Sequence, residues 1–229
     1  MSPELDPEIY WDAIYSATAF AGGKEPNSFL QRMLPRIRQG KILDIAMGEG
    51  VNAAYLAQKG SHIKGFDISG KAISRAVQLA KDTGVEIEAK RTDLDLFLMG
   101  VMEFDSVIMT YFKPSVTRFY GEIIKGLKQG GTLLVESFMT EEMEGGIPKN
   151  ESFRNFYYGP NELLSQLKDL RILFYHEGLV DQRHLVQCLA MKPLDKDAVK
   201  YGLFDMHTKQ IPTQESPHLR RAEDLFKKK

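Results

Sequence analysis

The stretch Lys41-Ile42-Leu43-Asp44-Ile45-Ala46-Met47-Gly48-Glu49-Gly50-Val51-Asn52-Ala53 decides the fold of this chain. An apolar run of strand-forming residues ends at Ile45, Gly48 and Gly50 interrupt it, and a helical pattern of alanine and leucine follows. Strand, glycine turn and helix form the first half of a βαβ unit. Because ligands of open parallel sheets bind beyond the carboxyl ends of the strands, we expect an α/β fold with a ligand site at this turn.

Asp44 is out of place in this apolar strand. A parallel strand is normally apolar on both faces, so an ionised carboxylate near its end costs free energy unless it has a partner. Glycine at positions 48 and 50 permits a sharp turn and lets a ligand lie against the main chain. Asp44 and the glycine turn are therefore candidate ligand contacts.

The residues of the turn distinguish two cofactors. Gly48-x-Gly50-x-x-Ala53 is compatible with a dinucleotide fingerprint, in which a pyrophosphate lies at the helix N-terminus. However, Asp44 and Glu49 place negative charge where a diphosphate would be repelled. S-adenosylmethionine has no phosphate and carries a sulfonium and an ammonium group. The acidic turn therefore favours S-adenosylmethionine, with an NAD(P)-dependent oxidoreductase as the alternative.

The pattern Asp44-x-Ala46-x-Gly48-x-Gly50 resembles motif I of the class I S-adenosylmethionine-dependent methyltransferases. The longer string 43–53 is similar to the branch that contains the tellurite-resistance and thiopurine methyltransferases. That branch often has a cysteine at the position of Met47 and an arginine at that of Val51, and these departures weaken an inference about the substrate. The resemblance spans residues 10–191. It implies a doubly wound, mostly parallel, seven-stranded Rossmann-like methyltransferase sheet with an antiparallel last strand and helices on both faces.

The ends of the next two strands complete the predicted cofactor site. Asp67 ends the strand 62–66 and can accept hydrogen bonds from both ribose hydroxyls, although capping of the helix from Ser69 is an alternative role. Asp93, preferred over Asp95, follows the strand 85–90; the resemblance implies that it accepts from the adenine amino group while the next backbone N–H meets a ring nitrogen. A solvated loop aspartate is the alternative. The predicted cofactor-binding residues are Asp44, Ala46, Gly48, Gly50, Asp67, Ile68, Asp93, Leu94, Thr110 and Trp11.

The predicted acceptor side lies where the apolar strand 104–110 ends. Its exit, Tyr111-Phe112-Lys113-Pro114, lacks the Asn-Pro-Pro-Tyr type sequence with which amino-group methyltransferases hold a planar nitrogen, so methylation of exocyclic amines on nucleic-acid bases is disfavoured. The irregular stretch 139–158 follows the strand 132–138 and is expected to be a substrate lid or, alternatively, a surface insertion. The predicted acceptor-side residues are Tyr15, Tyr111, Phe112, Tyr157 and Tyr158.

Three regions follow from this pattern. Residues 1–40 form an N-terminal helical arm with helix starts at Asp6-Pro7 and Asn27, either packed on the core or closing over the cofactor as a lid. Residues 41–192 form the S-adenosylmethionine-binding methyltransferase core. Residues 193–229 form a C-terminal extension with a short helix after Ser216-Pro217.

Composition narrows the function classes. The 30 basic and 31 acidic residues nearly cancel, so we expect no nucleic-acid partner. No apolar run approaches the ~20 residues of a membrane span, and the first residues do not form a signal sequence, so we expect no membrane association. The single cysteine, Cys188, excludes an internal disulfide, fits a cytoplasmic location and is expected to be buried. No cluster with metal-ligand spacing accompanies His176 and His184, so no metal is expected.

These features predict a methyltransferase that acts on a small-molecule acceptor, as a monomer or a homodimer. Transfer by in-line displacement requires alignment and a dry site rather than a dedicated acid–base pair. The sequence shows no convincing general base, which favours an acceptor that is already nucleophilic, such as a thiolate or a reduced chalcogen anion. No catalytic residue is predicted. A non-catalytic S-adenosylmethionine-binding module is a further alternative.

Overall fold

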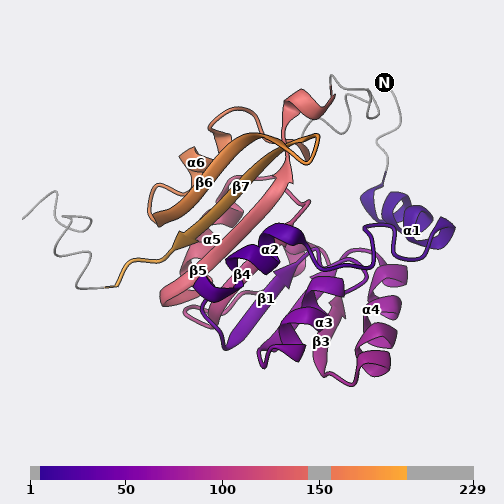
Figure 1. Ribbon diagram of the computed structural model, residues 1–229. Helices are drawn as coiled ribbons and strands as arrows, with labels where there is room; N and C mark the ends of the chain where they lie inside the picture. Colours follow the sequence, from indigo (N-terminus) through magenta and orange to yellow (C-terminus); the bar gives the residue numbers. More distant parts are fainter. Residues whose placement is uncertain (1–5, 144–155, 195–229) are drawn as a thin grey trace, which may run out of the picture. The chain divides into compact units, whose positions relative to one another are not determined.

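The computed structural model describes residues 6–143 and 156–194, and a seven-stranded sheet of order β3-β2-β1-β4-β5-β7-β6 runs through them (Figure 1). All pairings are parallel except those of β7, which runs antiparallel between β5 and β6. The strands are β1 (Lys41–Ile45), β2 (His62–Asp67), β3 (Ile87–Arg91), β4 (Phe104–Thr110), β5 (Leu127–Phe138), β6 (Arg171–Val180) and β7 (Arg183–Met191). The predicted mostly parallel sheet with an antiparallel last strand is confirmed.

Helices cover both faces of the sheet, as the sequence predicts. One buried cluster joins the sheet to helices α2, α3 and α4, and the other joins it to α5 and α6. The helices are α1 (Pro7–Ala17), α2 (Ser28–Met33), α3 (Val51–Gln58), α4 (Gly70–Thr83), α5 (Arg118–Gly126) and α6 (Glu162–Gln166), with 3-10 turns η1 (Leu34–Arg36), η2 (Leu94–Leu96) and η3 (Thr140–Met143). The sheet therefore contributes apolar side chains to two buried cores.

Local signals in the sequence fix where the helices begin. The side chains of Asp6, Asn27 and Ser69 cap α1, α2 and α4 by accepting backbone N–H groups of the first turn. Gly84 ends α4 in the left-handed conformation, at φ 68°. The helix starts predicted at Asp6-Pro7 and Asn27 are confirmed.

The central strand β1 pairs with β2 on one side and with β4 on the other. The chain order therefore reverses at β1, and ligands of such sheets bind in the crevice beyond the carboxyl ends of the strands at this point. Asp44 lies on β1 opposite Gly65 of β2 and Ile108 of β4. The topology thus places the glycine turn after β1 at the expected ligand crevice.

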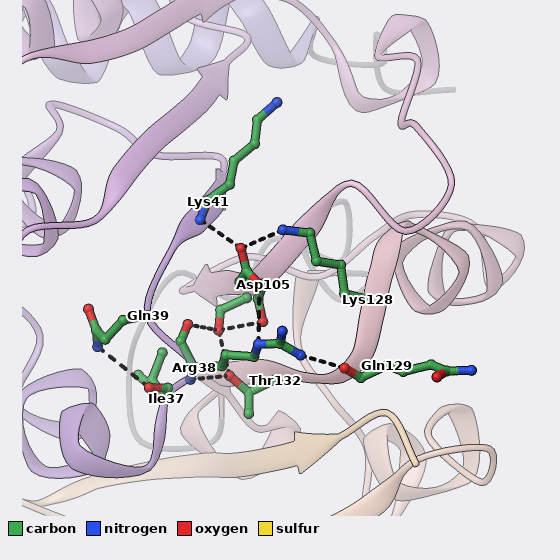
Figure 2. A network of polar contacts seen from close by, with 9 residues as sticks. Ile37, Arg38, Gln39, Lys41, Asp105, Lys128, Gln129 and Thr132 are labelled. Carbon is green, nitrogen blue, oxygen red and sulfur yellow. Dashed lines mark hydrogen bonds and ion pairs between the residues drawn. The ribbon is translucent and has the colours of Figure 1, made fainter. Parts of the chain in front are cut away.

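A polar network ties the opposite, amino ends of β1 and β4 together (Figure 2). Asp105, which is 7% exposed, accepts hydrogen bonds from the Lys41 amide at 3.0 Å and from Lys128 Nζ at 2.7 Å. Arg38 Nε lies 3.2 Å from the other carboxylate oxygen of Asp105. This buried aspartate is therefore fully compensated by protein groups.

The remaining predictions concern Cys188, a membrane span and the two segments 139–158 and 193–229. Cys188 is buried on β7, as expected. Within residues 6–143 and 156–194, no helix combines the length and apolar character that crossing a bilayer would require. The predicted extension 193–229, apart from its first two residues, lies outside the described residues, as does most of the stretch 139–158.

Candidate active site

The turn that follows β1 holds three residues at positive φ: Ala46 at 54°, Gly48 at 55° and Gly50 at 78°. A Cβ added at Gly50 would lie 2.7 Å from the Cβ of Ala76, so this glycine allows α3 to pack on α4. A Cβ at Gly48 would contact only the Tyr15 side chain, 3.0 Å from its hydroxyl. Gly48 thus faces the side on which a ligand would approach, whereas Gly50 serves helix packing.

Asp44 is 1% exposed, and neither of its carboxylate oxygens has a hydrogen-bond partner among the described residues. Burial, followed by the negative charge of Asp67, raises the pKa of Asp44 to about 8. A buried and uncompensated acid is unfavourable in a protein interior. Its chemistry fits a ligand that brings a positive charge and N–H donors, as the ammonium group of S-adenosylmethionine does.

Asp67 holds the glycine turn against the end of β2. One carboxylate oxygen accepts the Gly48 N–H and the other accepts the Ser69 N–H, both at 2.9 Å. Burial raises the pKa of Asp67, although the hydrogen bonds from Ser69, Gly48 and Ile68 amides oppose that effect. A carboxylate has about four acceptor sites, so these three amides leave at least one of them open. The Ser69 side chain caps α4, and Asp67 therefore remains able to accept ribose hydroxyls, the role predicted for it.

A cavity of about 680 Å³ opens beside the ends of β2 and β3. Ile68 and Asp93, both predicted to contact the adenosine part of the cofactor, line it together, and the first residues of α1 form another wall. The lining residues are Asp6, Pro7, Glu8, Ile68, Arg91, Thr92, Asp93 and Leu96. The side chain of Leu94, in contrast, packs in the core below, so only its backbone can serve the predicted adenine contact.

Glu49 joins the N-terminal arm to the glycine turn. Its carboxylate accepts the N–H groups of Phe20 and Ala21 and a hydrogen bond from Arg75, each at 2.7 Å. Arg75 also donates to the Thr18 carbonyl at 2.9 Å. From the sequence, the charge of Glu49 is expected to repel a diphosphate at the turn. Because Arg75 compensates it, Glu49 gives little repulsion toward a diphosphate, and the electrostatic preference depends on Asp44.

Helix α1 lies over the same turn through further contacts. Asp12 accepts hydrogen bonds from the Ser69 hydroxyl and, at 3.2 Å, from the Lys71 amide at the start of α4. The rings of Trp11 and Tyr15 stack with centroids 5.9 Å apart. Burial and the charges of Asp67 and Glu49 raise the pKa of Tyr15. Tyr15, a predicted acceptor contact, therefore lies at the glycine turn, and Trp11, a predicted cofactor contact, stacks on it.

A chain of amide side chains, not predicted from the sequence, links this turn to the ends of β4 and β5. Asn52 donates from its side chain to the Thr110 hydroxyl at 3.0 Å and accepts the Asn27 N–H at 2.9 Å. Asn27 in turn donates to Glu136 at 2.5 Å. Gln187 donates to the second carboxylate oxygen of Glu136, which is buried. The sequence predicts Asn27 only as a helix cap, and no local pattern marks Glu136.

The predicted acceptor-side residues divide into two groups. Tyr111 is exposed just after β4, and Tyr157 is half-buried. The centroid of the Phe138 ring lies 4.9 Å from that of Tyr111 and 6.0 Å from that of Tyr157. Phe112 is half-buried and packs against the core. Tyr158 is completely buried, and its hydroxyl is 2.5 Å from that of Tyr120. The prediction for Tyr158 is corrected, because its side chain has no surface to offer an acceptor.

Comparison with known proteins agrees with this geometry. Residues 42–131 match a family model described as "Methyltransferase domain". A ribosomal protein L11 methyltransferase of Dictyoglomus thermophilum is 23% identical over 130 residues, 55% of this chain and 42% of that protein. This chain thus spans less than half of that relative's length.

Two solved structures share the fold. A SAM-dependent methyltransferase from Methanosarcina mazei aligns with a TM-score of 0.59 and 20% identity over 74% of this chain and 99% of the other. TehB from Haemophilus influenzae aligns with a TM-score of 0.59 and 20% identity over 81% of this chain and 66% of the other. These likenesses confirm a Rossmann-like methyltransferase fold, and the domain match and the curated relative support an enzyme of the methyltransferase class.

Proposed function

We propose that this protein is an S-adenosylmethionine-dependent methyltransferase that transfers a methyl group to a small-molecule acceptor. The observation that carries the proposal is the Asp44 carboxylate, buried beside the glycine turn without a hydrogen-bond partner in the described part of the chain. A cationic ligand at the turn would supply the missing partner, whereas a dinucleotide phosphate would add a second negative charge.

The proposed cofactor contacts lie along the ends of β1, β2 and β3. Asp44 would hold the ammonium group, Gly48 would let the ligand lie against the main chain, and Asp67 would hold the ribose. Ile68 and Asp93 would hold adenine in the cavity that they line. The predicted roles of Ala46, Thr110 and Trp11 belong to the same proposal.

S-adenosylmethionine supplies a methyl carbon on a sulfonium sulfur, which a nucleophilic acceptor atom takes in line while the electron pair of the broken bond stays on that sulfur. The protein has to align the acceptor and exclude water. The arm 1–40 would contribute to this exclusion as a lid, because Glu49 and Asp12 fasten it over the turn. An acceptor that is already anionic would need no base for this step.

Ligand binding tests the proposal directly. Calorimetry with S-adenosylhomocysteine should give a dissociation constant in the micromolar range or below, and NADH under the same conditions should not bind. Tight NADH binding without S-adenosylhomocysteine binding would instead indicate the oxidoreductase. Binding of S-adenosylhomocysteine with no methylation in a broad panel of small molecules would leave a non-catalytic module or a macromolecular acceptor, of the kind that the L11 methyltransferase is named for.

A further inference from the structure

Tyr111 combines exposure with a fixed position. Its side chain is 47% exposed, yet its backbone is held at φ 55°, which is unfavourable for a bulky residue with a Cβ. The Tyr111 N–H donates to the Glu136 carbonyl at 2.7 Å. Such strain persists only where the surroundings enforce it, and it gathers at functional sites. Tyr111 is therefore a candidate for a task that requires a defined ring orientation.

The Tyr111 ring is fixed at its tip and along one side. Its hydroxyl hydrogen-bonds to the buried Glu136 carboxylate, and burial together with the charge of Glu136 raises the pKa of Tyr111. The Phe138 ring stacks against it, with centroids 4.9 Å apart and planes 24° apart. Glu136 is itself held by Asn27 and Gln187, each at 2.5 Å. The exposed aromatic surface of Tyr111 is thus preorganised.

Tyr111 lies at the edge of the sheet where the methyl acceptor is expected to bind. Apart from Thr110 and Trp11, the proposed cofactor contacts occupy the ends of β1, β2 and β3. The edge beyond Thr110 and beyond the end of β5 therefore remains for the acceptor. Tyr111 follows β4 directly and Phe138 ends β5. An acceptor atom has to lie about 3–3.5 Å from the methyl carbon, and it therefore has to bind at this part of the edge.

A positively charged group lies beside the rings. The Arg183 guanidinium lies 4.7 Å from the centroid of the Phe138 ring, and its charge also acts on the Tyr111 hydroxyl. Glu136, the nearby acid, is buried under three hydrogen bonds and is directed at protein groups. A cationic acceptor would be repelled by Arg183, whereas an anionic one would be attracted.

We propose that Tyr111 is a fixed aromatic platform for the methyl acceptor, that Glu136 is its positioning residue, and that the acceptor is a planar aromatic anion. The proposal rests on the proposed function and adds the acceptor class to it. A planar ring stacks on Tyr111, and its negative charge faces Arg183. An acceptor that is already anionic requires no base.

The test compares two thiol acids that differ only in the ring. Binding of 2-mercaptobenzoate and of 2-mercaptocyclohexanecarboxylate is measured by calorimetry on the full chain, with and without S-adenosylhomocysteine. The aromatic acid should bind about ten-fold more tightly than the saturated acid, in the range of aromatic stacking. Tyr111→Leu should abolish this preference, and Tyr111→Phe should retain most of it.

Two further variants complete the design. Tyr175→Leu is the matched control, because Tyr175 on β6 also donates its hydroxyl to a glutamate, Glu177, but lies away from β4. It should leave the aromatic preference unchanged. Arg183→Gln should lower the affinity for 2-mercaptobenzoate but not for its methyl ester.

Each outcome bears on one proposal. Equal binding of the two acids, no binding of the aromatic acid at millimolar concentration, or a preference that survives Tyr111→Leu would overturn the platform. Tighter binding of a cationic aromatic probe would overturn the charge assignment. The methyltransferase proposal itself depends on S-adenosylhomocysteine binding, which is measured separately, so a failure of the platform can be distinguished from a failure of the proposed function.

Discussion

Replacing Asp44 by asparagine should stabilise the ligand-free protein and weaken its binding of S-adenosylhomocysteine. The pKa of Asp44 rises from 3.8 to about 8 in the folded protein. One pKa unit corresponds to about 1.4 kcal/mol, so keeping Asp44 in the fold at pH 7 costs on the order of 4 kcal/mol relative to the unfolded chain. Asparagine has a similar shape but no ionisation, and it should recover roughly 2–4 kcal/mol at that pH.

The sign of this effect fixes its pH dependence. Because the folded-state pKa of Asp44 is raised, the folded protein binds more protons than the unfolded chain between pH 3.8 and about 8. The penalty is absent below this window, grows as the pH rises through it and is constant above it. Urea unfolding at pH 5, 6.5 and 8 should therefore show a stabilisation by Asp44→Asn that increases by roughly 1.4 kcal/mol per pH unit.

Ligand binding should move in the opposite direction. A cationic ligand stabilises the ionised carboxylate, so wild-type affinity should rise with pH up to about 8, and binding below that pH should release a proton. Loss of a charge-assisted hydrogen bond of about 2 kcal/mol predicts roughly 30-fold weaker binding of S-adenosylhomocysteine by Asp44→Asn at pH 8. Calorimetry in buffers of different ionisation enthalpy measures both the affinity and the proton release.

Asp105→Asn is the matched control, because Asp105 is also buried in the sheet but is compensated by Lys41, Lys128 and Arg38 (Figure 2). Burial opposes ionisation of Asp105, yet these partners lower its pKa overall. Its stabilising effect is therefore present above the unfolded-state pKa and is lost as the pH falls. This variant should destabilise the fold and leave ligand affinity unchanged. Destabilisation by Asp44→Asn at pH 8, or unchanged affinity, would refute the reasoning.

Three other perturbations test the remaining site assignments. Asp67→Ala should lose roughly 2–4 kcal/mol of S-adenosylhomocysteine binding by calorimetry, and unchanged affinity in a folded variant would remove the ribose role. Gly48→Val should abolish S-adenosylhomocysteine binding in a folded protein, and tight binding by this variant would show that the turn does not approach the ligand. Gly50→Ala should instead lower the unfolding temperature, because its Cβ meets Ala76. Deletion of residues 1–20 should weaken S-adenosylhomocysteine binding and lower turnover, with little effect on the unfolding of the sheet. S-adenosylhomocysteine should also protect the arm and the segment 139–158 from hydrogen exchange. Protection confined to the glycine turn would mean that the arm only packs against the core.

The sequence predicts the fold well because its signals are local. Apolar runs, glycine stops and caps lie within a few residues of the elements that they define, as at Asn27 and Ser69. The unpartnered state of Asp44 could also be anticipated, since an acid in an apolar strand is unusual before any contact is known. In each of these cases, the residues of one short segment are sufficient for the prediction.

The contacts that organise the acceptor edge depend on pairings that the sequence does not mark. Glu136 and Asn27 are 109 residues apart in the chain, and neither belongs to a motif. The sequence predicts that the charge of Glu49 repels a diphosphate, because nothing in the turn marks its partner Arg75 on α4. Tyr158 is predicted from the sequence as an acceptor-side residue, whereas its side chain is completely buried in the core. Tertiary packing, rather than residue type, decided all three.

The five buried acids of the described residues argue together for a ligand at the turn. Four have protein partners: Glu49 holds the arm, Asp67 holds the glycine turn, Asp105 ties the strand starts, and Glu136 fixes Tyr111. Each fulfils the usual condition for burying a carboxylate. Asp44 is the exception, although the same fold could have placed an amide or a basic group beside it. A partner that arrives with the ligand explains this exception, and it makes binding dependent on the charge of the ligand rather than on its shape alone.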